Sequence, residues 1–170
     1  MSDPGASTQS SAITASDPKR VTNVFDFSLA IGHHLLIFAL FGVLAAELVL
    51  VRPAMDHATV ERTARIDLWY GIIAGAVVIV GFVRAIFAAK GWTYYEHNAF
   101  FWAKMTTFVI VALLSISPTI RYLRWQRTRT SPGDAEIRHV RRLLWTQTAL
   151  FALLPAFAAA MARGFGENMF

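Results

Sequence analysis

Five ionisable side chains lie within segments of the chain that are otherwise long and apolar. They are two adjacent histidines, a glutamate, an arginine and a lysine: His33, His34, Glu47, Arg84 and Lys104. An ionised side chain costs about 2.5–3.5 kcal/mol at the centre of a membrane helix, so a sequence keeps such groups where they have a partner or a function. An imidazole can ligate a metal, and a guanidinium or ammonium group can bind an anion. We therefore take these residues as the candidates for chemistry.

The spacing of polar residues in the first apolar segment predicts which face of a helix they occupy. Intervals of seven join four residues: Asp26, His33, Leu40 and Glu47. On a packed helix this spacing keeps them on one face, and charge is expensive on a face that meets lipid. Adjacent residues point about 100° apart on a helix, so His33 and His34 cannot both face one site. We expect His33 to face the bundle, with His34 in its place if the phase is off by one.

Each of these residues also has a simpler interpretation. Arg84 and Lys104 can extend to the lipid headgroups while their stems stay in the hydrocarbon. Glu47 can form a structural ion pair, for which Arg65 is the expected partner and Arg52 the alternative. Either histidine can bond to a neighbouring hydroxyl or backbone carbonyl.

Composition and hydropathy predict the elements that position these side chains. The chain is 55% hydrophobic and 16% charged, whereas soluble domains carry about 25% charged residues. A helix needs about 20 apolar residues to cross a bilayer, and four segments meet that length. We predict an all-α fold, a four-helix transmembrane bundle, with a disordered tail at 1–24 and a membrane domain at 25–165. The expected spans are about 25–51, 68–89, 100–122 and 143–161.

The basic residues predict the orientation. The loops after the first and third spans hold ten of them: Arg52, Arg62, Arg65, Arg121, Arg124, Arg127, Arg129, Arg138, Arg141 and Arg142. The other side holds four: Lys19, Arg20, Lys90 and Arg163. Positive loops stay in the cytoplasm, so both termini are expected outside, with His33, Arg84 and Lys104 in the outer leaflet. The net charge of +5 is explained in this way, and we expect no nucleic-acid binding.

Several motifs together resemble an uncharacterised bacterial family of four-span membrane proteins. They are AEL at 46–48, RIDLWYG at 65–71, GFVR at 81–84, KGWTYY at 90–95 and NAFFWAK at 98–104. The resemblance covers nearly everything after the tail. It implies a multi-pass protein of the bacterial inner membrane and assigns no activity.

A second resemblance is to the HemJ-type protoporphyrinogen oxidases, small haem-associated membrane proteins. It rests on His33 or His34, Arg84 and the sequence Trp102-Ala103-Lys104. It implies a b-type haem with His33 as the metal ligand. Cationic partners for the propionates would be Arg84, Lys90 and Arg163, and Lys104 would be a second ligand if deprotonated.

Three functions remain open at the level of the sequence. The first is a haem-binding redox protein or a HemJ-like oxidase. The second is a small transporter that uses Glu47, His33 and Arg84 along a polar path. The third is an accessory membrane subunit without chemistry, in a homo-oligomer or a larger complex. The lipid bilayer is the expected surrounding in all three.

Overall fold

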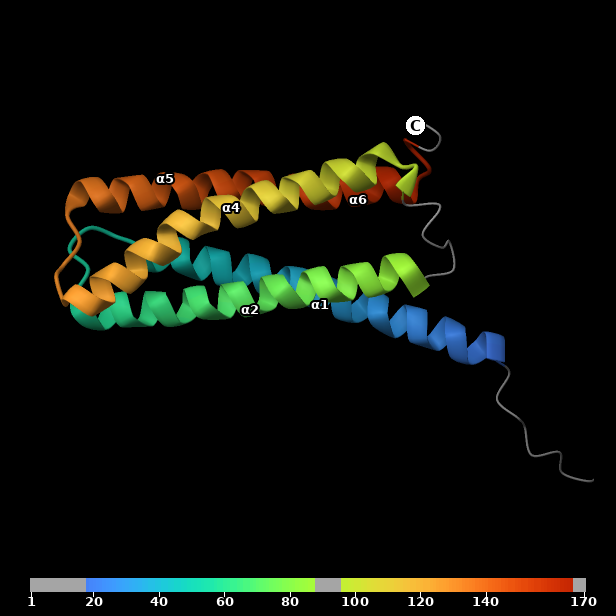
Figure 1. Cartoon of the computed structure of the whole chain (residues 1–170), viewed down its shortest axis with the longest axis horizontal. Coiled ribbons are helices and arrows are strands. Elements are labelled where there is room, and N and C mark those ends of the chain that lie inside the picture. Colours follow the sequence, from blue (N-terminus) through green and yellow to red (C-terminus); the bar gives the residue numbers. More distant parts are fainter. Residues whose placement is uncertain (1–17, 88–95, 167–170) are drawn as a thin grey trace, which may run out of the picture.

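The computed structural model describes residues 18–87 and 96–166, and these residues form helices and turns (Figure 1). The helices are α1 (Pro18–Leu50), α2 (His57–Phe87), α4 (Ala99–Thr128), α5 (Asp134–Phe151) and α6 (Leu153–Ala162). The described residues contain no strand, and four stretches are long and apolar enough to cross a membrane. The all-α, four-span fold predicted from the sequence is confirmed.

The fourth span is made of two helices, α5 and α6, which follow one another almost without a bend in Figure 1. The interruption lies at Ala152. Pro155 explains it, because proline has no N–H to donate to the carbonyl four residues earlier, at Phe151. The span nevertheless continues from Asp134 to Ala162.

The four spans close into a ring around one core. α1 packs on α2, α2 on α4, α4 on both α5 and α6, and α1 on α5. The buried side chains include Leu40 and Leu44 of α1 and Tyr122 and Trp125 of α4. Large apolar side chains also cover the outside, as at Phe38, which is 71% exposed. A surface of this kind fits a hydrocarbon surrounding.

The bundle has two different ends. One carries the turns at 51–56 and 129–133, and most of the basic residues lie beside it; we call it the arginine-rich end. The other carries the first residues of α1, the start of α4 and the end of α6, and we call it the terminus-bearing end (Figure 1).

Helices reach further at the arginine-rich end than the sequence predicted. The expected loop after the first span is mostly the start of α2, whose Val60 and Ala64 are buried in the core. Asp56 precedes this helix and accepts a hydrogen bond from the backbone N–H of Thr59 at 3.0 Å. That interaction, together with the Thr59 side chain, lowers the pKa of Asp56, and it satisfies a donor left free at the helix start.

The expected tail is only partly within the described residues. Residues 1–17 lie outside them, and α1 begins at Pro18, six residues before the predicted boundary at 24. At the other end of the segment, α1 stops at Leu50, close to the predicted end of the first span at 51.

Asn98 joins the start of α4 to the C-terminal residues. Its side-chain oxygen accepts a hydrogen bond from the backbone N–H of Phe100 at 3.0 Å, which caps the helix. Its amide nitrogen donates to the carbonyl of Phe165 at 3.2 Å. The N–H of Ala99 donates to the carbonyl of Gly166 at 3.3 Å. Asn98 is fully buried by these contacts and holds the terminus-bearing end together.

Candidate functional site

His33 turns inward from α1 and its ring lies against α2 at Gly81. A Cβ built on Gly81 would stand 3.2 Å from Cε1 of His33, so the ring occupies the space that glycine leaves open. The side chain is partly buried, and its Nδ1 atom is shielded without a hydrogen-bond partner. His33 thus faces the interior of the bundle, as its position on the helix predicted.

Arg84 of α2 and Lys104 of α4 lie close enough to His33 to act on it electrostatically, and they also act on each other. Both side chains are partly buried, and Nε of Arg84 is shielded without a partner. The ammonium group of Lys104 lies 5.6 Å from the ring centroid of Phe101, a cation–π contact. Among the described residues, neither Arg84 nor Lys104 forms an ion pair with an acidic side chain. We call these three residues the His33 cluster.

The structure does not bring the other two predicted site residues into this cluster. His34 is exposed on α1, and its Nδ1 atom lies 2.7 Å from the carbonyl oxygen of Ala30, one turn back on the same helix. Arg163 is exposed where α6 ends. Lys90, the third expected partner of the propionates, lies outside the described residues.

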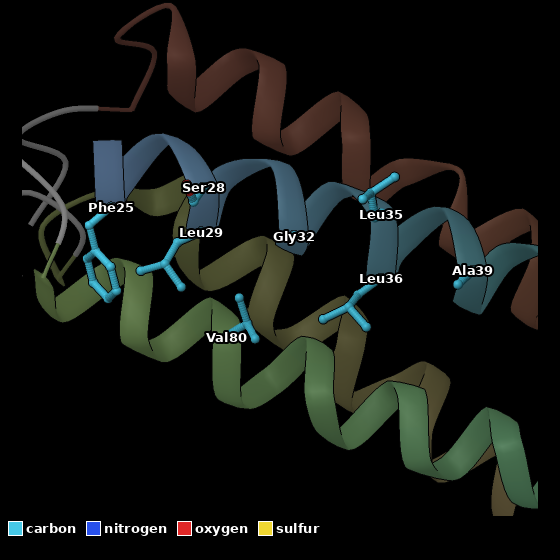
Figure 2. A pocket seen from close by; sticks show the side chains of 8 residues that line it. All are labelled: Phe25, Ser28, Leu29, Gly32, Leu35, Leu36, Ala39 and Val80. Atoms are coloured by element: carbon cyan, nitrogen blue, oxygen red, sulfur yellow. The ribbon is translucent and has the colours of Figure 1, made fainter. Parts of the chain in front are cut away.

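An apolar groove of about 550 Å³ runs beside the cluster, between α1 and α2. Figure 2 shows Leu29, Leu36 and Val80 turned toward the space between the two helices. Its full lining is Phe25, Ser28, Leu29, Gly32, Leu35, Leu36, Ala39 and Val80. The only hydroxyl in this lining, that of Ser28, already donates to the carbonyl of Val24 at 2.8 Å.

The imidazole of His33, the expected haem ligand, is packed on Gly81 and is not among the residues that line the groove. Among the described residues, no group of three histidine, aspartate or glutamate side chains could hold a metal ion. The predicted roles of His33 as a metal ligand and of Lys104 as a second ligand therefore stay predictions.

A second polar cluster lies toward the arginine-rich end, around Glu47. This side chain is 2% exposed, and its Oε1 atom has no hydrogen-bond partner. The expected partner Arg65 is exposed on α2, and no ion pair joins it to Glu47 in the structure. The groups that face Glu47 are instead the carboxyl group of Asp67 and the hydroxyl of Tyr122. We call Glu47, Asp67 and Tyr122 the Glu47 cluster.

Asp67 is buried on α2 and linked to α4. The hydroxyl of Thr119 lies 2.9 Å from its Oδ1 atom and 3.0 Å from the carbonyl oxygen of Ser115. The sequence analysis gave Asp67 no role. The available signal was its position two residues after Arg65, which turns it to another face of the same helix.

The arginines at this end bind groups other than Glu47. The guanidinium of Arg141 donates to the backbone carbonyls of Leu48 and Val51, which close the C-terminal end of α1. Arg124 and Arg121 both pair with Glu136. Helix ends leave carbonyls without partners, and cationic groups satisfy them, so Arg141 stabilises the turn after the first span.

The fold and its two interior clusters define a class: a four-span helical membrane protein with the basic His33 cluster toward one end of its interior and the acidic Glu47 cluster toward the other. The family is more specific. Residues 25–166 match the family described as a predicted membrane protein (DUF2214), and the chain belongs to that family. No curated protein and no solved structure matches the chain. The resemblance to HemJ-type oxidases is thus not shown, and no comparison supports a haem-binding or oxidase role.

Proposed function

We propose that this protein binds the phosphate or carboxylate group of an anionic lipid within the membrane, at the His33 cluster. One observation carries the proposal: two basic side chains lie near enough to an imidazole inside the bundle to act on it electrostatically, and neither has an acidic ion-pair partner among the described residues. Like charges repel strongly in a medium of low dielectric constant. An anion between Arg84 and Lys104 removes that repulsion and supplies acceptors for their N–H groups.

The neighbouring groove supports a ligand with an apolar chain. Val80 lines the groove, and Arg84 follows it by four residues, which places the two on one face of α2. Gly32 and Val80 also precede His33 and Gly81 directly in the chain. An acyl chain in the groove would therefore carry its headgroup toward Arg84.

Lipid retention in native mass spectrometry tests this proposal. The purified protein is offered phosphatidylglycerol and phosphatidylcholine in equal amounts, and we expect the anionic lipid to be retained preferentially. The double variant R84Q/K104Q should lose that preference. A hydrogen bond to a charged group contributes about 1.5–3 kcal/mol, so the affinity should fall by at least about tenfold.

The control is R163Q, which removes an exposed charge at the same end and should leave the preference unchanged. Equal retention by R84Q/K104Q and R163Q would contradict the proposal and favour an accessory subunit without a ligand. Inorganic phosphate should not displace the lipid at millimolar concentration. Displacement would point to a small soluble anion as the ligand.

Haem b at His33 is a second candidate, and its support is the imidazole Nδ1 atom that lacks a partner. Membranes that contain the protein, produced with ample haem, would then show a Soret band. His33→Ala should abolish or shift the band, and His57→Ala should leave it intact. A wild-type spectrum without Soret absorbance removes this candidate.

We also propose that the chain lies in a bacterial inner membrane with both termini outside. The support is the ten-to-four distribution of basic residues in the sequence between the arginine-rich end and the other end (Arg52, Arg62, Arg65, Arg121, Arg124, Arg127, Arg129, Arg138, Arg141 and Arg142 against Lys19, Arg20, Lys90 and Arg163). A reporter that is active only in the cytoplasm should be silent when fused after Phe170. A strong signal from that fusion would reverse the orientation.

A further inference from the structure

The Glu47 cluster combines acidic groups with buried atoms that lack partners. Glu47 is 2% exposed and Asp67 is 7% exposed, so both carboxyl groups are inside the bundle. The hydroxyl of Tyr122, which is completely buried, faces Glu47 and forms no hydrogen bond of ordinary geometry. The cluster draws on three helices, α1, α2 and α4.

We propose that Glu47 and Asp67 form an intramembrane protonation site, a carboxyl–carboxylate pair that holds at least one exchangeable proton. The site is separate from the His33 cluster and does not depend on the lipid-binding proposal. The ligand is the proton itself.

Electrostatic repulsion between Glu47 and Asp67 favours a proton at the pair. Two ionised carboxylates that share a buried site repel each other, and burial penalises each charge further. A basic residue would compensate them, but no described one lies within 4 Å of either carboxyl group. A proton on one of the two groups removes the repulsion and leaves only one buried charge.

The other groups around the two carboxyl groups carry no charge that would compensate an ionised pair. From α2, Tyr70 faces both acids, and from α4, Tyr122 does so. Both are neutral side chains near pH 7. From α5, the guanidinium of Arg141 reaches the end of α1, where it binds the carbonyls of Leu48 and Val51.

The hydroxyl of Thr119 also favours a proton on Asp67. It has one proton, yet its oxygen lies within hydrogen-bond distance of two oxygen atoms, the carbonyl of Ser115 and Oδ1 of Asp67. A carbonyl can only accept, so when the hydroxyl donates to Ser115, the contact with Asp67 needs a proton on the carboxyl group, which donates to the Thr119 oxygen. A protonated Asp67 thus supplies a hydrogen to both contacts of Thr119.

Infrared spectroscopy of the full-length protein in lipid bilayers tests the site. A protonated carboxyl group has a carbonyl stretch that an ionised one lacks, and we expect this band at neutral pH. The variants E47Q and D67N should reduce it, and the double variant should remove the part that belongs to the pair. Two control variants should leave that part intact. E61Q changes a half-exposed glutamate that pairs with His57, and D26N changes another carboxyl group within a span.

Stability gives a second measurement that does not depend on the band. Asparagine has the shape of a protonated aspartate and can donate to the Thr119 oxygen, so D67N should unfold at nearly the wild-type temperature. A pair that is ionised on both groups and holds a bound cation would instead make D67N clearly less stable, as removal of one partner leaves the other uncompensated.

Three results would overturn the proposal. One is a wild-type spectrum without a protonated-carboxyl band at neutral pH. Another is a band that the double variant E47Q/D67N retains in full. The third is a wild-type unfolding temperature that is higher in sodium or potassium than in N-methylglucamine at equal ionic strength, when the E47Q variant shows no such difference. That outcome would identify a metal-cation site in place of a proton.

Discussion

Single residues decide where the polar groups of this protein meet. His33 could be assigned to the interior from the heptad that it shares with Leu40 and Glu47, because a buried stripe has that period. The contact of His33 with Gly81 could not be predicted, because nothing in the sequence fixes the position and rotation of α2 relative to α1. The same uncertainty explains the wrong partner for Glu47. Arg65 faces outward, and the residue that faces Glu47 is the acidic Asp67.

Replacing Gly81 with alanine tests the close contact with His33. Alanine normally stabilises an exposed helix position by up to about 1 kcal/mol relative to glycine. At Gly81 the new Cβ would stand 3.2 Å from Cε1 of His33, so the ring must shift. An off-rotamer side chain costs about 0.5–1.5 kcal/mol, so Gly81→Ala should gain little or lose stability.

Gly75→Ala is the matched control, because no atom lies within 4 Å of its Cβ position on the same helix. It should show the full gain in the free energy of unfolding, measured in bilayers or bicelles. Equal gains for the two variants, with unchanged imidazole signals of His33 in NMR, would mean that the ring does not pack on Gly81.

At the scale of elements, hydropathy located all four spans but not their ends. The extensions of α2 and α4 at the arginine-rich end are amphipathic, with buried residues such as Val60 and Trp125 between charged ones. A hydropathy window treats such a segment as a loop, because charged residues cancel its apolar face. The interruption between α5 and α6 follows from one proline, which sequence reasoning passed over. The hydrogen bond from Asn98 to Phe165 joins residues that are distant in the sequence, so no local pattern predicts it.

Asn98→Ala should destabilise the terminus-bearing end. The variant removes the cap of α4, which is worth about 1 kcal/mol, and the hydrogen bond to the carbonyl of Phe165. Asn98→Ser keeps an uncharged oxygen for the cap but loses the donor to Phe165, so its loss should be smaller. The free energies of unfolding of the two variants provide the comparison.

An Asn98→Ala protein as stable as the wild type would show that neither contact contributes. Gly166→Ala provides an independent check of the same junction. Gly166 has a φ of +79°, and a Cβ there would stand 2.7 Å from Cδ2 of Phe100, so this variant should also be less stable.

The two polar clusters of the interior lie toward opposite ends of the molecule. Two cations and an imidazole lie toward the terminus-bearing end, and two carboxyl groups lie toward the arginine-rich end. The sequence indicated the first grouping through the estimated depths of the residues, and it indicated the second only in part. Neither grouping is neutralised within the described residues, and this is why we assign an anion to one and a proton to the other.

Solid-state NMR distances between lysine nitrogen and lipid phosphorus test the central proposal most directly. The chain has three lysines, Lys19, Lys90 and Lys104, so a protein labelled with ¹⁵N at lysine Nζ has few signals, and K104Q assigns one. In bilayers that contain phosphatidylglycerol, we expect ³¹P to dephase the Lys104 signal strongly. R84Q should weaken this dephasing, because Arg84 and Lys104 hold the same phosphate. A Lys104 signal that is not dephased contradicts a shared anion site. Dephasing that R84Q leaves unchanged contradicts it as well, because a lysine that merely extends to the headgroups would behave in that way.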